Sequence, residues 1–266
     1  MESFPPLSVA IITFNEENNI RDCLESVAGF ADEIIVLDSF SSDNTEKICK
    51  EFDNVKFTQH AFDGHITQKN RALDLCSHEW ILSIDADERV TPELSESIKE
   101  FLASDPKAVG AKFPRLTYHM KKYIRHGGWY PNARYRLIKK GCAKWGGENP
   151  HDTIFLDGKG VSIRGDLIHY SFEDLSDQVE TNNKFSSIKA FTRKEKGKKF
   201  ILWRLFLKPV GKFIETYMIK RGALDGMQGF IISISAAYST FLEEAKLYEL
   251  DRLKTERISN LPKSYK

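Results

Sequence analysis

Short apolar runs alternate with amphipathic segments over the first 113 residues of the chain. The pattern predicts strands near residues 8–13, 33–37, 55–59, 79–85 and 109–113, with helices between them. The first run, Ser8–Thr13, is rich in β-branched residues and lacks polar alternation, which is typical of a strand buried on both faces. Regular alternation of strands and helices favours an α/β fold with a mostly parallel sheet.

The amino-acid composition changes after residue 113. Residues 114–170 are rich in Gly, Trp, Tyr, Arg and Asn, a composition typical of loops that carry a binding site on a rigid scaffold. Residues 226–242 are uncharged but contain Gln, Ser and Thr, which favours a buried or interfacial helix over a membrane span. With 266 residues, 41% of them hydrophobic, the chain can bury one full core, and a C-terminal appendage follows it.

The cysteines and the first residues indicate the compartment. Four cysteines show no C-x-x-C spacing and fall mostly in predicted helices, namely Cys23, Cys49, Cys76 and Cys142. This favours reduced thiols in a cytoplasmic protein over a disulfide framework or a zinc site. The start of the chain, MESFPP, lacks the basic and apolar regions of a signal peptide.

Basic charge is concentrated in one segment. The formal net charge is only +1, but residues 193–221 carry ten basic and two acidic side chains, a net charge of +8, interleaved with aromatic residues such as Trp203 and Tyr217. Two interpretations stay open: an interfacial helix on an anionic membrane surface, peripheral on the inner face of the cytoplasmic membrane, or a helix packed on the rest of the protein with a solvated lysine face. Nothing resembles a base-reading module, so the charge does not indicate nucleic-acid binding.

Candidate chemistry begins where the fourth predicted strand ends. The apolar run from Trp80 stops at Asp85-Ala86-Asp87, and the two carboxylates can point the same way because strand side chains alternate faces. Carboxylates at the exit of a strand suit a divalent metal that bridges the phosphates of a nucleotide. Thr91-Pro92 just beyond predicts a helix start.

Polar residues also follow the first two predicted strands. Thr13, Asn15 and Glu16 lie at the exit of the first strand, and Asp38 ends the second, where nucleotide-binding folds hold a ribose or base. Asp43, three residues before Glu46, resembles a capping box and is expected to cap a helix. The first turn has neither G-x-G-x-x-G nor a Walker lysine, which argues against dinucleotide and P-loop chemistry.

These segments resemble the inverting glycosyltransferases of family 2, which have a GT-A fold. The resemblance runs in order through SVAIITFNEE, IIVLDSFSSDNT, ITQKNRALDL and WILSIDADE. Within the family the chain is most similar to bacterial lipopolysaccharide core β-glucosyltransferases, through GENPHD, LIHYSF, the basic segment and IKRGALDGMQGF. The resemblance implies a GT-A catalytic domain at 1–175, with a nucleotide-sugar half at about 1–113 and an acceptor half at about 114–175, and a helical C-terminal region at 176–266.

The resemblance also implies roles for individual residues. Asp38 would hold the uracil, Asp85 the ribose, and Asp87 a Mg²⁺ or Mn²⁺ ion on the diphosphate, with Thr13, Asn15 and Glu16 lining the nucleotide pocket. Gln68 and Lys69 would open a helix, with Lys69 meeting a phosphate or the base. Arg134 and Arg136 match an Arg-Leu element that would meet the diphosphate or an anionic acceptor, and His169 would complete the metal or diphosphate contacts.

The family pattern places the catalytic base directly after a histidine, here at Asp152 following His151, although many relatives have Glu there. Glu148 is the rival base. The expected reaction is metal-dependent transfer of a hexose from a UDP-sugar, with UDP-glucose favoured, to a glycolipid or oligosaccharide such as the lipopolysaccharide inner core. Polyprenyl-linked and protein acceptors stay open. A sugar nucleotidyltransferase would need a glycine-rich loop where this chain has TFNEENN, and a glycoside hydrolase would need carboxylates flanking a sugar bond.

Overall fold

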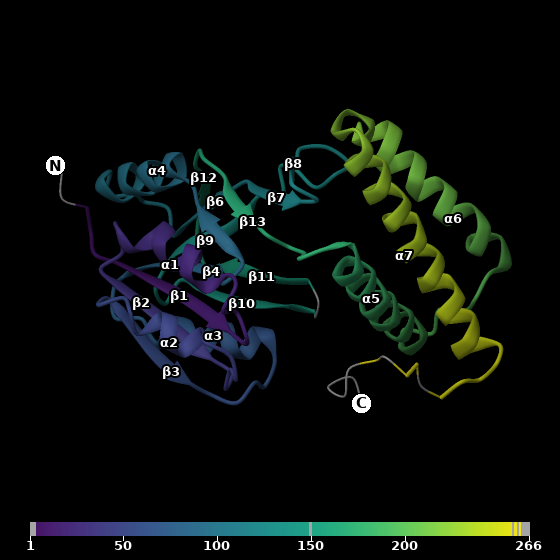
Figure 1. Cartoon of the computed structure of the whole chain (residues 1–266), viewed down its shortest axis with the longest axis horizontal. Coiled ribbons are helices and arrows are strands. Elements are labelled where there is room, and N and C mark those ends of the chain that lie inside the picture. Colours follow the sequence, from purple (N-terminus) through teal and green to yellow (C-terminus); the bar gives the residue numbers. More distant parts are fainter. Residues whose placement is uncertain (1–3, 149–150, 257, 260, 262–266) are drawn as a thin grey trace. The chain divides into compact units, whose positions relative to one another are not determined.

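The chain folds into two compact units. The computed structural model describes residues 4–148, 151–256, 258–259 and 261. The first unit comprises residues 1–116 and 131–170, and the second comprises residues 117–130 and 171–266. The α/β elements fall in the first unit and the long C-terminal helices in the second (Figure 1).

A seven-stranded mixed sheet forms the centre of the first unit. Its strand order is β12-β6-β9-β4-β1-β2-β3. Strands β1 to β4 run parallel, whereas β9 is antiparallel to both β4 and β6. The strands span β1 Leu7–Thr13, β2 Glu33–Asp38, β3 Val55–Gln59, β4 Trp80–Asp85, β6 Gly110–Phe113, β9 Arg134–Lys139 and β12 Gly160–Ser162. The five strands expected before residue 114 are therefore present, within one residue of their predicted limits.

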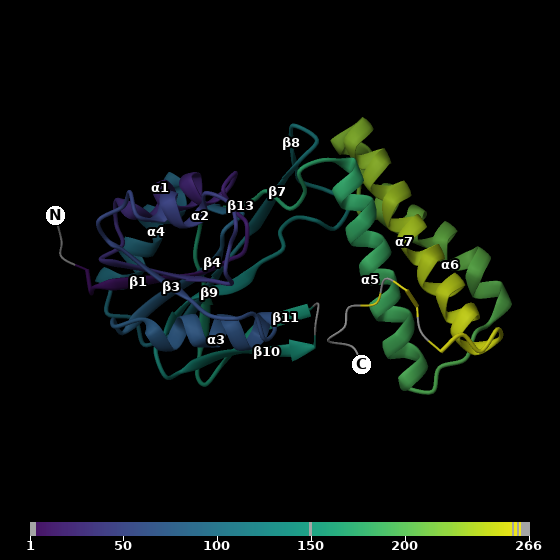
Figure 2. The same cartoon turned by 60° about the horizontal axis from the view of Figure 1, so that its bottom comes forward.

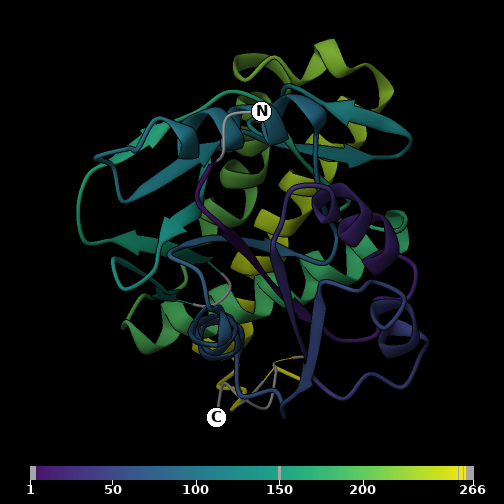
Figure 3. The same ribbon diagram turned by 90° about the vertical axis from the view of Figure 1, so that its left-hand side faces the viewer.

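Helices cover both faces of this sheet because the central strands are apolar on both faces. Val9 and Val36 point to a core formed with α1 (Ile20–Ala28) and α4 (Pro92–Ala103), while the adjacent Ala10 and Leu37 point to the opposite core, formed with α3 (His65–Leu75). Figures 1 and 3 show α4 and α3 on opposite sides of the strands. The short helix α2 (Thr45–Cys49) lies between β2 and β3.

The helix start expected at Thr91-Pro92 is confirmed: Pro92 is the first residue of α4, and the Thr91 side chain accepts a hydrogen bond from the Leu94 amide. The cap expected at Asp43 is confirmed in part: its carboxylate accepts a hydrogen bond from the first amide of α2, that of Thr45, but Asn44 is the residue directly before the helix. The Asp43 carboxylate also accepts from the Thr45 hydroxyl and from the Glu17 amide. Asp43 therefore ties the loop after β2 to the loop after β1.

One strand pair and part of a four-stranded sheet, of order β5-β13-β7-β8, complete the first unit. β5 (Glu88–Val90) pairs antiparallel with β13 (Leu167–His169), directly after the D-x-D turn. β10 (Ala143–Glu148) and β11 (His151–Leu156) form an antiparallel pair in which Gly147 faces Asp152. Figure 2 shows this pair beside α3.

The second unit is built on three long helices: α5 (Leu175–Glu195), α6 (Leu202–Ile214) and α7 (Met227–Asp251). α7 packs against both α5 and α6. A π-helical turn (Glu215–Ile219) and a 3₁₀ turn (Gly222–Asp225) join α6 to α7. Gly229 permits this junction, because a Cβ there would lie 1.8 Å from the Gly222 carbonyl oxygen. No helix among the described residues is long and apolar enough to cross a membrane.

One segment belongs to a different unit from the one expected. The sequence placed residues 117–130 in the acceptor half of the catalytic domain, but they pack with the C-terminal helices. β7 (Arg115–His119) and β8 (Lys122–Ile124) form a hairpin there. The buried Asp225 carboxylate accepts from the His126 amide at 2.8 Å, and Lys122 donates to the Asp225 carbonyl at 2.7 Å. These polar contacts join segments about a hundred residues apart, so local sequence pattern does not reveal them.

Candidate active site

The candidate site lies at the carboxyl ends of β1, β2 and β4. Because β4 pairs with β1 on the side opposite β2, the strand order reverses here, which is where open α/β sheets bind ligands. Thr13 faces Asp38 and Ile12 faces Asp85 in the register of these strands. The three strand-end residues predicted from sequence thus reach the same edge of the sheet.

The Asp38 carboxylate is fully buried and serves the protein itself. One oxygen accepts from the hydroxyls of Thr13 and Ser41, and the other accepts from the Ser41 amide and the Gln59 side chain. A carboxylate has about four acceptor positions, and protein donors use all of them here. Asp38 therefore organises the loop after β2, and a contact with a nucleotide base would have to replace one of these donors.

The loop after β1 is fixed by the same neighbouring loop. Asn15 adopts a left-handed conformation with φ of 56°, which Asn tolerates better than most residues. Its amide donates to Ser41, its side-chain oxygen accepts from the Ser42 amide, and the Glu16 amide donates to Thr45. Asn15 itself is exposed, so its side chain holds the rim of the site together.

Asp85 is held between two cations. Its oxygens lie 2.9 Å from Lys69 Nζ and 2.9 Å from Arg136 Nη2. Burial would raise the pKa of Asp85, but the charges of Lys69 and Arg136 outweigh it and hold the pKa well below its usual range. Asp85 is therefore a permanent anion, engaged through both oxygens.

Glu88 also contacts this charged cluster, although the sequence pattern did not predict it. It is fully buried, accepts from the Asp85 amide at 3.0 Å, and lies 2.7 Å from Arg136. Burial would lower the pKa of Arg136, but Glu88 and Asp85 raise it well above its usual value. The position of Glu88 directly after the D-x-D was the only available signal, and an acid there is equally typical of an exposed turn.

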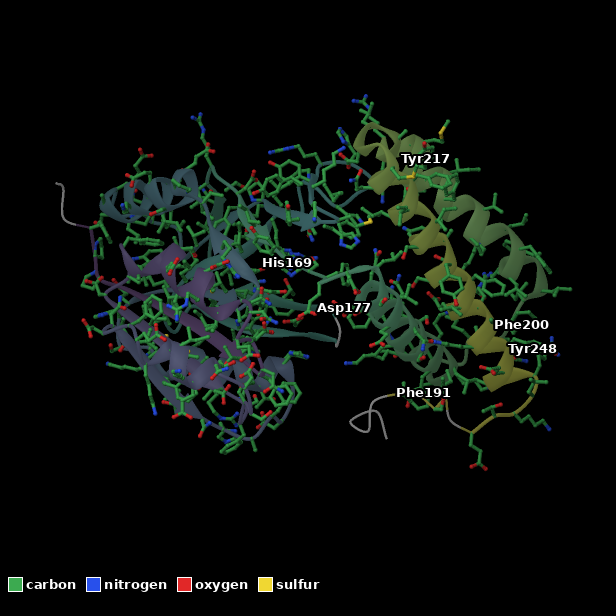
Figure 4. The ribbon with its side chains drawn as sticks, in the orientation of Figure 1. His169, Asp177, Phe191, Phe200, Tyr217 and Tyr248 are labelled. Atoms are coloured by element: carbon green, nitrogen blue, oxygen red, sulfur yellow. The ribbon has the colours of Figure 1, made fainter. Side chains whose placement is uncertain are left out.

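Asp87 and His169 form a separate pair. The Asp87 Oδ2 lies 3.0 Å from His169 Nε2, and both side chains are partly exposed. Figure 4 marks His169, which ends β13. Glu16 lies close by, and its pKa is raised, chiefly by burial, with the Asp87 charge adding to the effect. A carboxylate oxygen and an imidazole nitrogen are ligands that Mn²⁺ accepts, and Mg²⁺ accepts the first, so the pair fits the expected metal.

Among the described residues, the Asp87–His169 pair supplies only part of a metal-binding site. No group of three or more His, Cys, Asp and Glu side chains in that part of the chain is arranged to hold a metal ion. The two oxygens of Asp85 already contact cations, whereas Asp87 contacts a histidine. Of the two aspartates of the D-x-D, Asp87 is thus the better candidate ligand.

The β10–β11 pair brings the predicted base to Asp85. Asn70 of α3 brackets the Trp145 backbone, accepting from its amide and donating to its carbonyl at 2.9 Å each. With these two hydrogen bonds in place, Lys69 Nζ lies over the Trp145 ring, 4.2 Å from its centroid, and 2.8 Å from Asp152 Oδ2. Lys69 thereby bridges Asp85 and Asp152. Asn70 and Trp145 were not predicted, because their contact joins segments 75 residues apart.

Arginines border this cluster. Arg136 Cζ also lies over the Trp145 ring, 5.0 Å from its centroid, and its Nε and Nη1 are buried without a hydrogen-bond partner among the described residues. The side chain of Arg134 is exposed overall, but partial burial of its guanidinium, followed by the charges of Arg115 and Arg136, lowers its pKa. The rival base Glu148 and the neighbouring His151 belong to β10 and β11, but their side chains lie outside the part of the chain that the structure describes.

Gln68 is buried, and its side chain makes hydrogen bonds within the protein. It is fully buried in α3, and its side-chain amide donates to Ser39 and to the His60 carbonyl, while its oxygen accepts from Arg71. The structure thus sorts the predicted residues into three sets. Lys69, Asp85, Arg136 and Asp152 form one charged cluster, Asp87, His169 and Glu16 form its neighbour, and Thr13, Asn15, Asp38 and Gln68 support the surrounding loops.

Comparison with known proteins explains this geometry. The family model described as glycosyl transferase family 2 matches residues 8–156, which cover the whole cluster. The chain belongs to glycosyl transferase family 2. It is 32% identical over 259 residues to the lipopolysaccharide core biosynthesis glycosyltransferase LpsC of Rhizobium meliloti, covering 94% of each chain. It is also 32% identical to an uncharacterized glycosyltransferase of Rickettsia typhi, over 92% of this chain and 87% of that one.

A solved structure supports the fold. The mannosyltransferase PcManGT from Pyrobaculum calidifontis, in complex with GDP-Man and Mn²⁺, aligns with a TM-score of 0.55 at 10% identity, covering 92% of this chain and 87% of that one. The GT-A fold expected from sequence is therefore confirmed, as is the assignment of the chain as a glycosyltransferase. The family also accounts for charged residues gathered at the carboxyl edge of a sheet with no phosphate-binding glycine loop.

Proposed function

We propose that the protein is an inverting glycosyltransferase that transfers a hexose from a UDP-sugar to a saccharide acceptor. The observation that carries the proposal is the bridge from Asp85 through Lys69 to Asp152, with the Asp87–His169 pair beside it. Lys69 contacts both carboxylates, of which Asp152 would act as the base and Asp85 would hold the nucleotide. An inverting reaction needs a base for the acceptor hydroxyl and stabilisation of the departing diphosphate.

The donor would lie over the loops at the ends of β1, β2 and β4. Asp85 would accept from the ribose hydroxyls, and Thr13, Asn15, Glu16, Asp38 and Gln68 would shape the pocket for the base. Arg136 has two buried donors without a partner among the described residues, and an anionic oxygen of the donor or acceptor would satisfy such donors. Lys69, a compact cation between two carboxylates, can move toward a phosphate when the donor enters.

Asp87 and His169 would hold a Mg²⁺ or Mn²⁺ ion, with the remaining ligands supplied by diphosphate oxygens and water. When bound, such an ion acts as a Lewis acid that neutralises charge on the leaving group. Asp152 would take the proton from the acceptor hydroxyl. Its neighbour Lys69 fixes the direction of the carboxylate, so that one oxygen stays on the cation and the other can face the acceptor.

The relatives support a particular acceptor and leave the sugar less defined. Similarity to LpsC over 94% of both chains favours a lipopolysaccharide core saccharide, and we favour UDP-glucose as the donor. A polyprenyl-linked sugar or a protein side chain is the alternative acceptor. Sugar nucleotidyl transfer is disfavoured, since the loop after β1 is built from Asn15 and Glu16 instead of glycines.

A donor screen tests the proposal. Purified protein with Mg²⁺ or Mn²⁺ is incubated with UDP-glucose, UDP-galactose, UDP-N-acetylglucosamine and GDP-mannose, and released nucleoside diphosphate is measured with and without lipopolysaccharide core oligosaccharide. We expect turnover with a UDP-hexose that rises when the acceptor is present. Release of sugar 1-phosphate instead of a nucleoside diphosphate, or no turnover of any sugar nucleotide, would contradict the proposal.

Substitution of the candidate metal ligand gives a sharper result. Asp87→Ala should abolish transfer while the thermal unfolding curve stays unchanged, because metal stabilisation of the leaving group is worth several kcal/mol. UDP-dependent binding of Mn²⁺, measured by electron paramagnetic resonance, should be lost as well. The control Asp53→Ala changes an exposed aspartate that precedes β3 and is away from the carboxyl ends of β1, β2 and β4. Near-normal turnover by Asp87→Ala would remove the metal assignment.

A further inference from the structure

The helix α6 has an apolar face that is exposed among the described residues of the second unit. The side chains of Leu202, Trp203, Phe206, Leu207 and Val210 are 56–64% exposed, and none of the residues of α6 is buried. Their spacing of three and four residues places them on one side of the helix. The opposite side, including Leu205 and Lys208, packs toward α7 and its neighbours.

The apolar surface continues beyond α6. Met218 and Ile219 in the π-helical turn are 63% and 73% exposed, and Leu224 in the 3₁₀ turn is 64% exposed. α7 also has an exposed stripe at helical spacing, consisting of Met227, Phe230, Ile234, Tyr238 and Phe241. These exposed apolar side chains are too many to be scattered single residues, and large exposed apolar patches mark interaction sites.

The charges separate into those used inside the unit and those left at the ends of α6. Arg193, Lys194, Lys208, Lys212 and Lys220 all pair with carboxylates of the second unit. Among the described ion pairs, none involves Lys198 or Lys199, which precede α6, or Arg221, which follows the π-helical turn. α6 itself contains no acidic residue. The apolar face is thus flanked by unneutralised cations.

We propose that α6 and its flanking residues form a docking surface for an anionic lipid bilayer, with the apolar face inserted and Lys198, Lys199 and Arg221 at the level of the headgroups. An amphipathic helix with Trp, Phe and Leu on one side and flanking basic residues is suited to lie in a membrane interface. Charge complementarity favours anionic lipid over a second copy of this chain, because a twofold contact would bring the same cations together. Carboxylates of the second unit neutralise part of the +8 charge of residues 193–221. Insertion of the apolar face therefore contributes more to membrane binding than this charge alone would indicate.

Co-sedimentation with vesicles tests this surface. The full chain is mixed with phosphatidylcholine vesicles containing about one third phosphatidylglycerol, or with phosphatidylcholine alone. We expect binding to the anionic vesicles that falls as salt is raised, since the attraction is screened over about 8 Å at physiological ionic strength. A residual part should survive high salt. Lys198→Ala with Lys199→Ala should weaken anionic binding by about fivefold for each charge removed.

Apolar substitutions separate insertion from simple charge attraction. Phe206→Glu with Leu207→Glu should lower partition to anionic vesicles at least tenfold. The matched control is Phe62→Glu with Leu75→Glu, one exposed Phe and one exposed Leu in the first unit, 53% and 43% exposed. All four side chains are exposed, so circular dichroism should show equal folding. Equal vesicle binding by the two double variants would overturn the proposal. So would a wild-type protein that binds no vesicles but forms a dimer, if Phe206→Glu with Leu207→Glu dissociates that dimer.

Discussion

Lys69 is the residue that joins the proposed donor and acceptor sides of the site, since it contacts both Asp85 and Asp152. The resemblance led us to expect Lys69 to meet a phosphate or base, but it could not reveal the contact with Asp152, because these residues are 83 positions apart. Asp38 and Gln68 show the opposite case. They occupy the predicted positions, yet their hydrogen bonds are satisfied by the protein.

The base assignment can be tested by one substitution. Asp152→Asn keeps the size of the side chain and removes its capacity to accept a proton. We expect turnover to fall by about 10² to 10⁴, with donor affinity little changed. Steady-state kinetics and calorimetric titration of UDP separate the two effects. Glu148→Gln is the comparison: a larger loss in that variant than in Asp152→Asn would move the base to Glu148.

At the scale of elements, hydrophobic pattern was sufficient for the strands that build the sheet. β1, β2 and β4 are buried on both faces and form nearly continuous apolar runs, so their positions were predicted within one residue. The cap at Thr91 was predicted because its partner is three residues away. The link that Asp43 makes between the loops after β1 and β2 was not predicted, because its carboxylate accepts from the distant Glu17 amide as well as from the nearby Thr45 amide.

Glu33 links three elements at the start of β2, and its contribution depends on pH. Burial would raise the pKa of Glu33, but hydrogen bonds from Lys56, Ser8 and Ser77 outweigh it and lower the pKa to about 2. A carboxylate with a lowered pKa in the folded state stabilises the protein above its unfolded pKa and loses this effect as the pH falls toward the folded value. The relevant window is therefore about pH 4.5 to 2.

Glu33→Gln should lower the free energy of unfolding by about 2 to 3 kcal/mol at pH 7, the order implied by the change in pKa. Urea unfolding at pH 7 and pH 3 measures the difference from the wild type, which should be smaller at pH 3. Glu96→Gln, which removes an exposed pair with Lys99, should have little effect at either pH. An equal loss for Glu33→Gln at both pH values would show that its charge is not the cause.

At the scale of the whole molecule, the chain divides into two compact units, one of residues 1–116 and 131–170 and one of residues 117–130 and 171–266. The assignment of residues 117–130 to the second unit could not be predicted. Nothing in the hairpin sequence marks it as a partner of Asp225, because a buried carboxylate and its donors carry no periodic signal. The +8 segment was recognised from composition, but its internal ion pairs and its exposed apolar face required the structure.

The stereochemistry of the reaction tests the central claim most directly. UDP-glucose carries an α-linked sugar, so a single displacement assisted by Asp152 must give a β-linked product. Proton NMR of the product, formed on a lipopolysaccharide core acceptor or on water and read before mutarotation, distinguishes the two anomers. We predict the β anomer with the wild type and about 10² to 10⁴ less product with Asp152→Asn. An α-configured product, or undiminished product from Asp152→Asn, would contradict the proposed mechanism.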